Sequence, residues 1–353
     1  MLHALLREFG SPEVIVDAST SSLSRFVAAD VAQAIRAIRS TTGDEATAAT
    51  IEWAATPGNL LLTWDDERYP RTLLELTDPP PMLYCTGDPA RLNEPALAMV
   101  GSRNASPGGL QTAEEFAEAF ASSGVNVVSG LALGIDGAAH RGALKAAGPT
   151  STIAVIGTGI DRVYPARNRD LAHRIAERGV IVSEFALGTP PLAYNFPRRN
   201  RLISGLSRGV LVVEAALSSG SLITARFAAE QGKDVFAIPG SIHSPFSKGC
   251  HRLIKDGAKL VETAADVLEE LGLAAAVTTP SRGNGRAGGR ATLEHLGEDD
   301  KKLLEALGYD PISADEAVAR TGWAIERVLS TLLHLELGGS VARLPGDRVQ
   351  RVS

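Results

Sequence analysis

Short apolar runs alternate with amphipathic stretches through the middle of the chain. The apolar runs cover residues 96–100, 125–129, 152–156, 180–183, 210–214 and 235–238. Between them, apolar residues recur at helical spacing over 109–122, 135–146, 168–178 and 221–231. This alternation is typical of parallel strands joined by crossover helices, and runs that are apolar throughout indicate strands buried on both faces. The pattern predicts an α/β fold with a doubly wound, mostly parallel sheet.

The flanking segments have different patterns. Residues 2–55 are Ala-rich and helical, and the following stretch, with a short strand predicted at 82–86, is interrupted by Pro79-Pro80-Pro81. Near the C-terminus, three short helical patterns precede two alternating stretches, which predicts a winged-helix module. We therefore expect a helical, SAM-like domain at 1–62, a sheet domain at 63–272, a flexible Gly- and Arg-rich linker at 273–297 and a winged helix at 298–353.

Composition limits the cellular setting. No stretch of the 353 residues approaches the apolar length of a membrane span, and the N-terminal residues do not resemble an export signal. We therefore expect a cytoplasmic protein with no membrane span. The two cysteines, Cys85 and Cys250, lie far apart in sequence, so we expect neither a disulfide framework nor a zinc site but two buried or half-buried apolar side chains.

Charge is unevenly distributed along the chain. The formal net charge is −6, which argues against a protein that coats nucleic acid with its whole surface. Residues 161–201, however, contain eight arginines and four acidic residues. This segment offers a local basic surface for an anionic partner, although a solvated helix face is the simpler interpretation of the run taken alone.

Small and polar residues follow almost every predicted strand. Ligands of open α/β sheets bind beyond the carboxyl ends of the strands, where glycine permits close approach and helix N-termini attract anions. Any one of these glycines taken alone is best explained by a tight turn. Together with nearby arginines they predict a phosphate-binding site. The candidate nucleic-acid-binding residues are Gly101, Ser102, Arg103, Gly157, Thr158, Gly159, Arg167, Asn168, Arg169, Arg199, Asn200, Gly220 and Ser221.

Enzymatic interpretations find less support. No complete dinucleotide-binding fingerprint and no P-loop motif are present, and we expect no cofactor. Asp136 and His140 are spaced to share a helix face, but they lack a third metal ligand, so we interpret them as structural and expect no metal site. Glu184 and Glu214 end strands, where each is suited either to act as a general base or to orient a loop.

Several motifs together resemble the DprA family, also called Smf. The similar segments run from about Tyr69 to Leu271 and include 101–103, 129–140, 157–165, 195–206, 219–224 and 237–240. The resemblance implies an extended Rossmann-like, homodimeric domain without catalysis. It also implies a protein that binds and protects single-stranded DNA and helps load RecA recombinase during DNA uptake and natural transformation.

The resemblance also assigns a role to one side chain. Arg103 matches the arginine of the Gly-Ser/Thr-Arg loop, which binds DNA phosphate in the family. The stretch after Tyr164-Pro165 is usually lysine-rich there, whereas this chain has Ala166-Arg167-Asn168-Arg169, so the arginine that replaces the lysine stays open. Phe196 and Tyr194 are the best candidates for stacking on bases, although core packing suits Phe196 better.

Two rival functions remain after this comparison. The first is a phosphoribohydrolase-like nucleotide enzyme on a related sheet. Such enzymes carry a glutamate after their glycine loop, and residues 219–226 contain none. The second is a transcription factor that reads DNA with its winged helix. The third helix of the module, at 324–335, has few polar side chains, so contact with a protein suits it at least as well.

Overall fold

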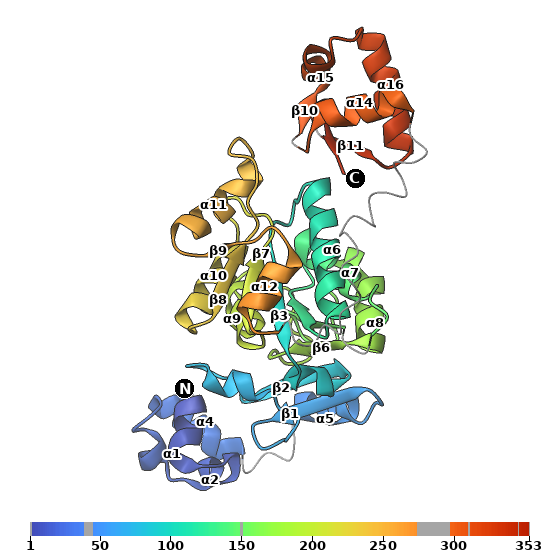
Figure 1. Cartoon of the computed structure of the whole chain (residues 1–353). Helices are drawn as coiled ribbons and strands as arrows, with labels where there is room; N and C mark the ends of the chain where they lie inside the picture. The colour runs from blue at the N-terminus through green and yellow to red at the C-terminus, as the bar shows by residue number, and fades with distance from the viewer. Residues whose placement is uncertain are drawn as a thin grey trace.

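The computed structural model describes residues 2–38, 45–148, 151–273, 297–309, 311–344 and 346–352. A central α/β domain lies between N-terminal helices at one end and a small C-terminal module at the other (Figure 1). Within the described ranges, no helix has both the length and the apolar character needed to cross a membrane.

The central sheet has nine strands in the order β1-β2-β6-β5-β4-β3-β7-β8-β9. Its parallel strands are β3 (Ala96–Val100), β4 (Asn126–Ser129), β5 (Thr152–Val155), β6 (Val180–Ser183), β7 (Gly209–Val212), β8 (Asp234–Ala237) and β9 (Lys259–Leu260). The strands β1 (Asn59–Thr63) and β2 (Met82–Gly87) extend one edge in antiparallel orientation. The predicted mostly parallel α/β fold is confirmed.

Helices cover both faces of this sheet because alternate strand residues point to opposite sides. Leu97 and Met99 of β3 pack in the core beneath α6 (Pro107–Ser122), α7 (Ile135–Ala143) and α12 (Ala264–Glu270). Ala98 and Val100 belong to the opposite core, beneath α9 (Asn195–Gly205), α10 (Ser221–Glu230) and α11 (Lys248–Lys255). On the side of α7, α8 (Arg169–Arg178) packs over β5 and β6. Cys85 and Cys250 are buried free thiols, as predicted.

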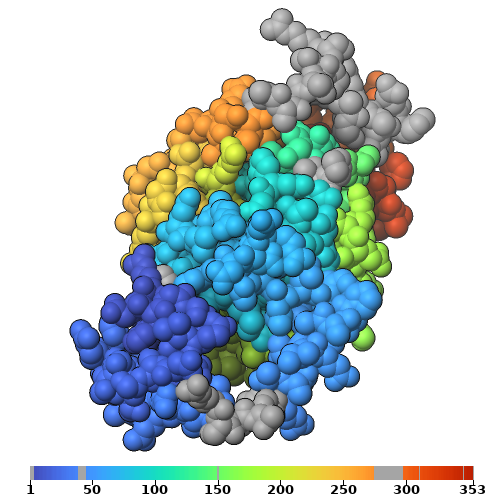
Figure 2. All heavy atoms as spheres, turned by 90° about the horizontal axis from the view of Figure 1, so that it is seen from below, coloured from blue at the N-terminus to red at the C-terminus, as the bar shows by residue number. Residues whose placement is uncertain are grey.

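The N-terminal region divides earlier than expected. Helices α1 (Leu2–Phe9), α2 (Pro12–Asp17), α3 (Thr20–Leu23) and α4 (Ala29–Ile38) enclose a small core of their own. Helix α5 (Glu45–Ala54) instead contacts β1, and Trp53 packs its ring against Tyr84 of β2. The sheet therefore begins at Asn59, ahead of the expected boundary at 62/63. Figure 2 views this end of the molecule and shows the N-terminal helices beside the β1–β2 region.

The segment 64–81, here called the connector, is anchored by buried polar contacts. The phenol of Tyr69 is fully buried and donates a 2.6 Å hydrogen bond to the carbonyl oxygen of Pro80. The indole N–H of Trp64 donates to the same oxygen at 2.9 Å. These two bonds hold the triple-proline segment against the beginning of the connector, ahead of the 3₁₀ turn Arg71–Glu75.

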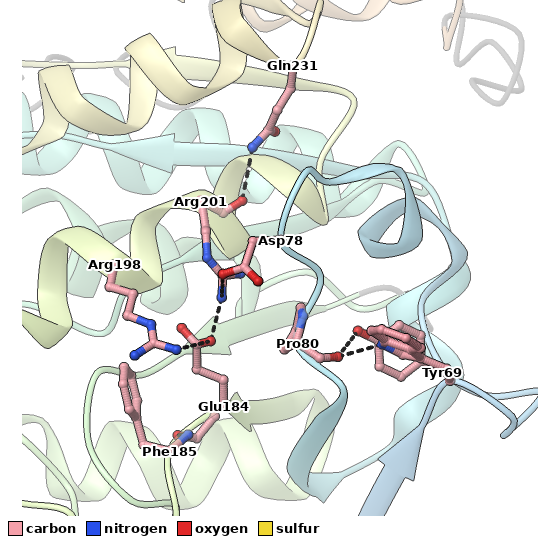
Figure 3. A network of polar contacts seen from close by, with 10 residues as sticks. Tyr69, Asp78, Pro80, Glu184, Phe185, Arg198, Arg201 and Gln231 are labelled. Atoms are coloured by element: carbon pink, nitrogen blue, oxygen red, sulfur yellow. Dashed lines mark hydrogen bonds and ion pairs between the residues drawn. The ribbon is translucent and has the colours of Figure 1, made fainter. Parts of the chain in front are cut away.

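A charged network then ties the connector to the sheet domain (Figure 3). The carboxylate of Glu184, at the end of β6, accepts a hydrogen bond from Arg201 of α9 and lies 3.8 Å from the guanidinium of Arg198. Arg201 also lies 4.0 Å from Asp78 of the connector. The side chains of Glu184 and Arg201 are only 4% and 12% exposed, so each needs the other as a charged partner. The network fixes α9 relative to β6.

The C-terminal module is the winged helix predicted from the sequence. It contains α14 (Glu298–Leu307), β10 (Ile312–Ser313), α15 (Ala314–Thr321), α16 (Ile325–Leu337), β11 (Val341–Leu344) and β12 (Arg348–Arg351). The three strands form a separate sheet, and leucines from α14 and α16 fill the core. Almost all of the predicted linker lies outside the described residues.

Replacing Glu184 tests the charged network. We expect Glu184→Ala to lower the free energy of unfolding by about 3 kcal/mol, because the buried Arg201 would keep only the exposed Asp78, 4.0 Å away, as a charged partner. The exposed Glu177→Ala on α8 is the matched control and should change stability by less than about 0.5 kcal/mol. Urea unfolding of both variants measures the difference. Equal stability of the two variants would show that the network contributes nothing net.

Candidate functional site

The strand order reverses between β3 and β7. From β3 the chain continues through β4, β5 and β6 on one side, whereas β7, β8 and β9 extend the sheet on the other. Loops that follow β3 and β7 therefore diverge, and such a switch point leaves a crevice for a ligand. A pocket of about 650 Å³ opens there. Its lining includes Gly101, Ser102, Arg103, Arg199, Asn200, Gly220 and Ser221, all of which the sequence had singled out.

The loop between β3 and α6 is held in place by Glu214, which follows β7. The carboxylate of Glu214 accepts hydrogen bonds from the backbone N–H and the hydroxyl of Ser106, at 2.9 and 2.6 Å. Its carbonyl oxygen accepts a 2.7 Å bond from the N–H of Ser102. Burial raises the pKa of Glu214, and the two bonds from Ser106 oppose that shift. Of the two roles expected for Glu214, the structure shows loop orientation.

Gly101 is required by this close packing. A Cβ atom at this position would lie 2.6 Å from the side chain of Ile135 and 2.8 Å from the carbonyl oxygen of Glu214. Any larger residue would push the loop away from the sheet. The glycine thus sets the position of the residues that follow it, Ser102 and Arg103.

Arg103 supplies the exposed positive charge at the pocket. Its guanidinium carbon lies 5.6 Å from the ring centroid of Phe196, a distance suited to a cation–π contact. The ring centroids of Tyr164 and Phe196 lie 5.6 Å apart, with an interplanar angle of 40°. Within the described part of the chain, no carboxylate pairs with Arg103. Its hydrogen-bond donors are therefore available to an anionic ligand.

Arg199 lines the same pocket but is an interior residue. It is 4% exposed, and its guanidinium donates a 2.6 Å hydrogen bond to the carbonyl oxygen of Val155. A Cβ atom at position 130 would overlap this guanidinium, so Gly130 makes the space for it. Burial lowers the pKa of Arg199 to about 10, with Asp136 opposing the shift. The guanidinium remains charged at neutral pH, and one of its N–H donors is bonded inside the protein.

Asp136 and His140 have the structural roles expected of them. The carboxylate of Asp136 accepts bonds from the N–H groups of Gly130 and Ala132, at 3.2 and 3.4 Å. The Nε2 atom of His140 accepts from Leu131 at 3.2 Å, and its Nδ1 lies 2.7 Å from the hydroxyl of Thr152. Together they fix the loop between β4 and α7. The described residues contain no cluster of His, Cys, Asp or Glu able to hold a metal ion.

The other candidate loops do not line the pocket. Gly157-Thr158-Gly159 is buried, and a Cβ atom at Gly157 would lie 2.9 Å from the ring of Phe196. Thr158 donates its hydroxyl hydrogen to the carbonyl oxygen of Arg162. Asn168 is also buried and donates to the carbonyl oxygens of Leu131 and Ala132. Arg167 and Arg169 are exposed but lie outside the pocket lining.

Other residues of the lining were not selected from the sequence. They include Asn104, Tyr164, Ser218, Ser219 and Thr224. Ser218 and Ser219 belong to the same serine-rich turn as Gly220, and the hydroxyls of Ser219 and Ser221 lie 2.7 Å apart. That turn was visible in the sequence as a run of small polar residues. Tyr194, expected to stack on bases, is 67% exposed but does not line the pocket.

Comparison with known proteins identifies the family. The family model described as DNA recombination-mediator protein A matches residues 60–272, and that of the DprA winged helix domain matches 290–347. The chain belongs to the DprA/Smf family. Protein Smf of Escherichia coli is 45% identical over 301 residues, which cover 84% of this chain and 79% of that protein. DprA of Streptococcus pneumoniae is 49% identical over 205 residues, covering 58% and 72%.

Solved DprA structures share the fold. The structure of DprA from Streptococcus pneumoniae matches with a TM-score of 0.61 and 44% identity, covering 67% of this chain and 81% of that one. DprA from Helicobacter pylori, whose structure is described by its single-stranded DNA binding mode, matches with a TM-score of 0.55 and 32% identity, covering 60% and 95%. The family resemblance seen in the sequence motifs is confirmed.

The buried imidazole of His140 gives a testable pH dependence. Burial lowers the pKa of His140 to about 3, whereas a histidine in the unfolded chain has a pKa of about 6.5. Between these values only the unfolded chain gains the proton, so stability present above about pH 6.5 is lost as the pH falls. We expect this residue to cost about 2 kcal/mol of stability between pH 7 and pH 5.

Urea unfolding of the wild type and of His140→Gln at both pH values isolates this contribution. The loss on acidification should be smaller in His140→Gln by about 2 kcal/mol. The buried carboxyl groups of Asp136, Glu184 and Glu214, whose pKa values burial raises, act in the opposite sense in both proteins and largely cancel in the comparison. An identical loss in the two proteins would contradict the assignment.

Proposed function

We propose that this chain binds single-stranded DNA at the pocket between the ends of β3 and β7. The observation that carries the proposal is Arg103, an exposed guanidinium at the lip of a pocket on the switch point of the sheet. The relative from Helicobacter pylori, described by its single-stranded DNA binding mode, supports the choice of ligand. Arg103 would bind one phosphate of the DNA backbone, and the polar turns of Ser102 and Ser219-Gly220-Ser221 would contact the neighbouring phosphates.

The geometry favours recognition of the backbone over recognition of base sequence. The polar residues of the lining include Arg103 and several serines, whose guanidinium and hydroxyl groups suit phosphate oxygens, while the lining carboxylate of Asp136 is bonded to the N–H groups of Gly130 and Ala132. Tyr164 and Phe196 provide aromatic surface for stacking, which every base accepts. Arg198, 58% exposed on α9, and the exposed Arg167 and Arg169 would add positive charge for a bound DNA strand outside the pocket lining. Binding should therefore show slight sequence preference and strong salt dependence.

The proposal includes the partners that the family resemblance implies. The chain would protect the bound strand and load RecA recombinase onto it during DNA uptake. It would do so in the cytoplasm, as a homodimer that forms through the sheet domain. No enzymatic turnover is proposed. Among the described residues, the carboxylates of Asp136, Glu184 and Glu214 each hold a loop or an arginine in place.

Substitution of Arg103 tests the site. We expect Arg103→Ala to weaken binding of single-stranded oligonucleotides by about 1–3 kcal/mol, equally across sequences, and to lower the salt slope by about one ion. Arg103→Lys should restore the salt slope more fully than the affinity, because lysine keeps the charge without the planar fork. Fluorescence-anisotropy titrations at several salt concentrations measure both quantities.

Arg252→Ala is the matched control for this experiment. Arg252 is an exposed arginine on α11 that pairs with Asp256 and lies outside the pocket lining. Its loss should leave the affinity unchanged within error, and the thermal melting points of both alanine variants should equal that of the wild type. Unchanged affinity in Arg103→Ala, or tighter binding of duplex than of single strands, would refute the proposal.

A further inference from the structure

The winged helix touches the sheet domain at the start of α6. The module lies beyond one end of this helix (Figure 1), and its strand β12 contacts it. Gly108, in the first turn of α6, faces the side-chain amide of Gln350 on β12. A Cβ atom at position 108 would lie 3.0 Å from Nε2 and 3.5 Å from Cδ of Gln350. The two surfaces are therefore in direct contact, and Gly108 leaves room for the amide.

The amide of Gln350 points out of its own module. β12 is the middle strand of the three-stranded sheet, and Val349 packs into the core of the winged helix. Successive residues of a strand point to opposite faces, so Gln350 faces away from that core. It is nevertheless only 8% exposed. The start of α6 supplies part of the cover, so this residue is a docking contact between the two domains.

The docking contact is imperfectly satisfied. The Nε2 atom of Gln350 donates a 3.0 Å hydrogen bond to the carbonyl oxygen of Tyr309, whereas its Oε1 is buried without a hydrogen-bond partner. A buried acceptor without a partner costs free energy that is recovered when water reaches it. Charged side chains of the module pair within the module, as Arg343 does with Glu336. The module is therefore held in a position from which it can be displaced.

The docked module stands next to the loop that carries Arg103. Gly108 follows Arg103 by five residues, and Glu214 fastens the intervening Ser106 to the sheet. This loop leads from the lip of the pocket to the docking contact. Since Gly108 and Gln350 touch, no DNA strand can pass between α6 and β12 while the module is docked. A strand that runs from Arg103 along the loop meets the module.

We propose that the winged helix docks reversibly on the start of α6 and competes there with single-stranded DNA that extends from the pocket. Phosphates are attracted to Arg103, whereas docking leaves the Oε1 atom of Gln350 unpaired, so a bound strand displaces the module. Linkage makes the effect reciprocal: holding the module docked weakens DNA binding by the factor with which DNA opposes docking. The inference rests on the proposed DNA site and adds a partner in the same chain that covers its approach.

Two engineered thiols test the docking in the full-length chain. Gly108→Cys with Gln350→Cys places a thiol on each side of the contact, and both native thiols are buried. We expect a short bis-methanethiosulfonate reagent to link the two within one chain at least about tenfold faster than the control pair Glu118→Cys with Gln350→Cys. Glu118 is exposed on α6, ten residues and about 15 Å further along the helix. Mass spectrometry of the denatured protein measures the link within one chain.

The same pair of thiols tests the competition with DNA. We expect the linked form to bind single-stranded oligonucleotides about tenfold more weakly than the unlinked form, and reduction, which removes the link, to restore the affinity. A saturating oligonucleotide should slow the linking of the 108/350 pair, because bound DNA displaces the module. Fluorescence anisotropy before and after reduction gives both affinities on one protein sample.

The outcomes separate this inference from the proposed function. Equal linking of the two pairs would overturn the docking, and equal affinity of the linked and reduced forms would overturn the competition, while the DNA site itself would stand. Failure of the wild type to bind single strands would overturn the proposed function and this inference with it.

Discussion

Glu214 accepts two hydrogen bonds from Ser106 through its carboxylate and one from Ser102 through its backbone carbonyl. These three bonds join the loop after β3 to the loop after β7, which are the two loops that diverge at the switch point. They add to the pairing of β3 with β7 and to the two apolar cores that both halves of the sheet share. The pocket, the position of Arg103 and the start of α6 all depend on this junction. An internal carboxylate, that of Glu214, therefore occupies the N-terminus of α6, a position that attracts anionic ligands in other helices.

The sequence predicted the layout of the sheet well where burial is complete. The bounds of β3 and β6 agree with the predicted runs, because every residue in them is buried and the apolar pattern is unbroken. β1 was missed because Leu60-Leu61-Leu62 follows an Ala-rich helix and has no alternation that would separate it from that helix. α9 was not recognised as a helix because Pro197 and a cluster of arginines obscure its apolar face, which consists of only Leu202 and Ile203.

The site was predicted in outline but not in detail. A glycine that admits a ligand and a glycine that admits a neighbouring side chain look the same in sequence. Gly157 faces the ring of Phe196 and Gly130 faces Arg199, and only the tertiary contacts separate these from the glycines of the pocket. Consecutive arginines pose the same difficulty, since neighbours on a helix point about 100° apart. Arg198 therefore faces solvent while Arg199 is buried.

The cations around the pocket are arginines, and its lining in the described chain includes no lysine. A guanidinium keeps its proton at any pH a cell reaches, and enzymes that acetylate lysine do not act on it. Acetylation, which neutralises lysine-rich surfaces, therefore cannot lower the positive charge of the arginine surface around this pocket. The affinity of such a surface for a polyanion would respond instead to ionic strength and to competing polyanions, which makes it a constitutive surface that is not controlled by lysine modification.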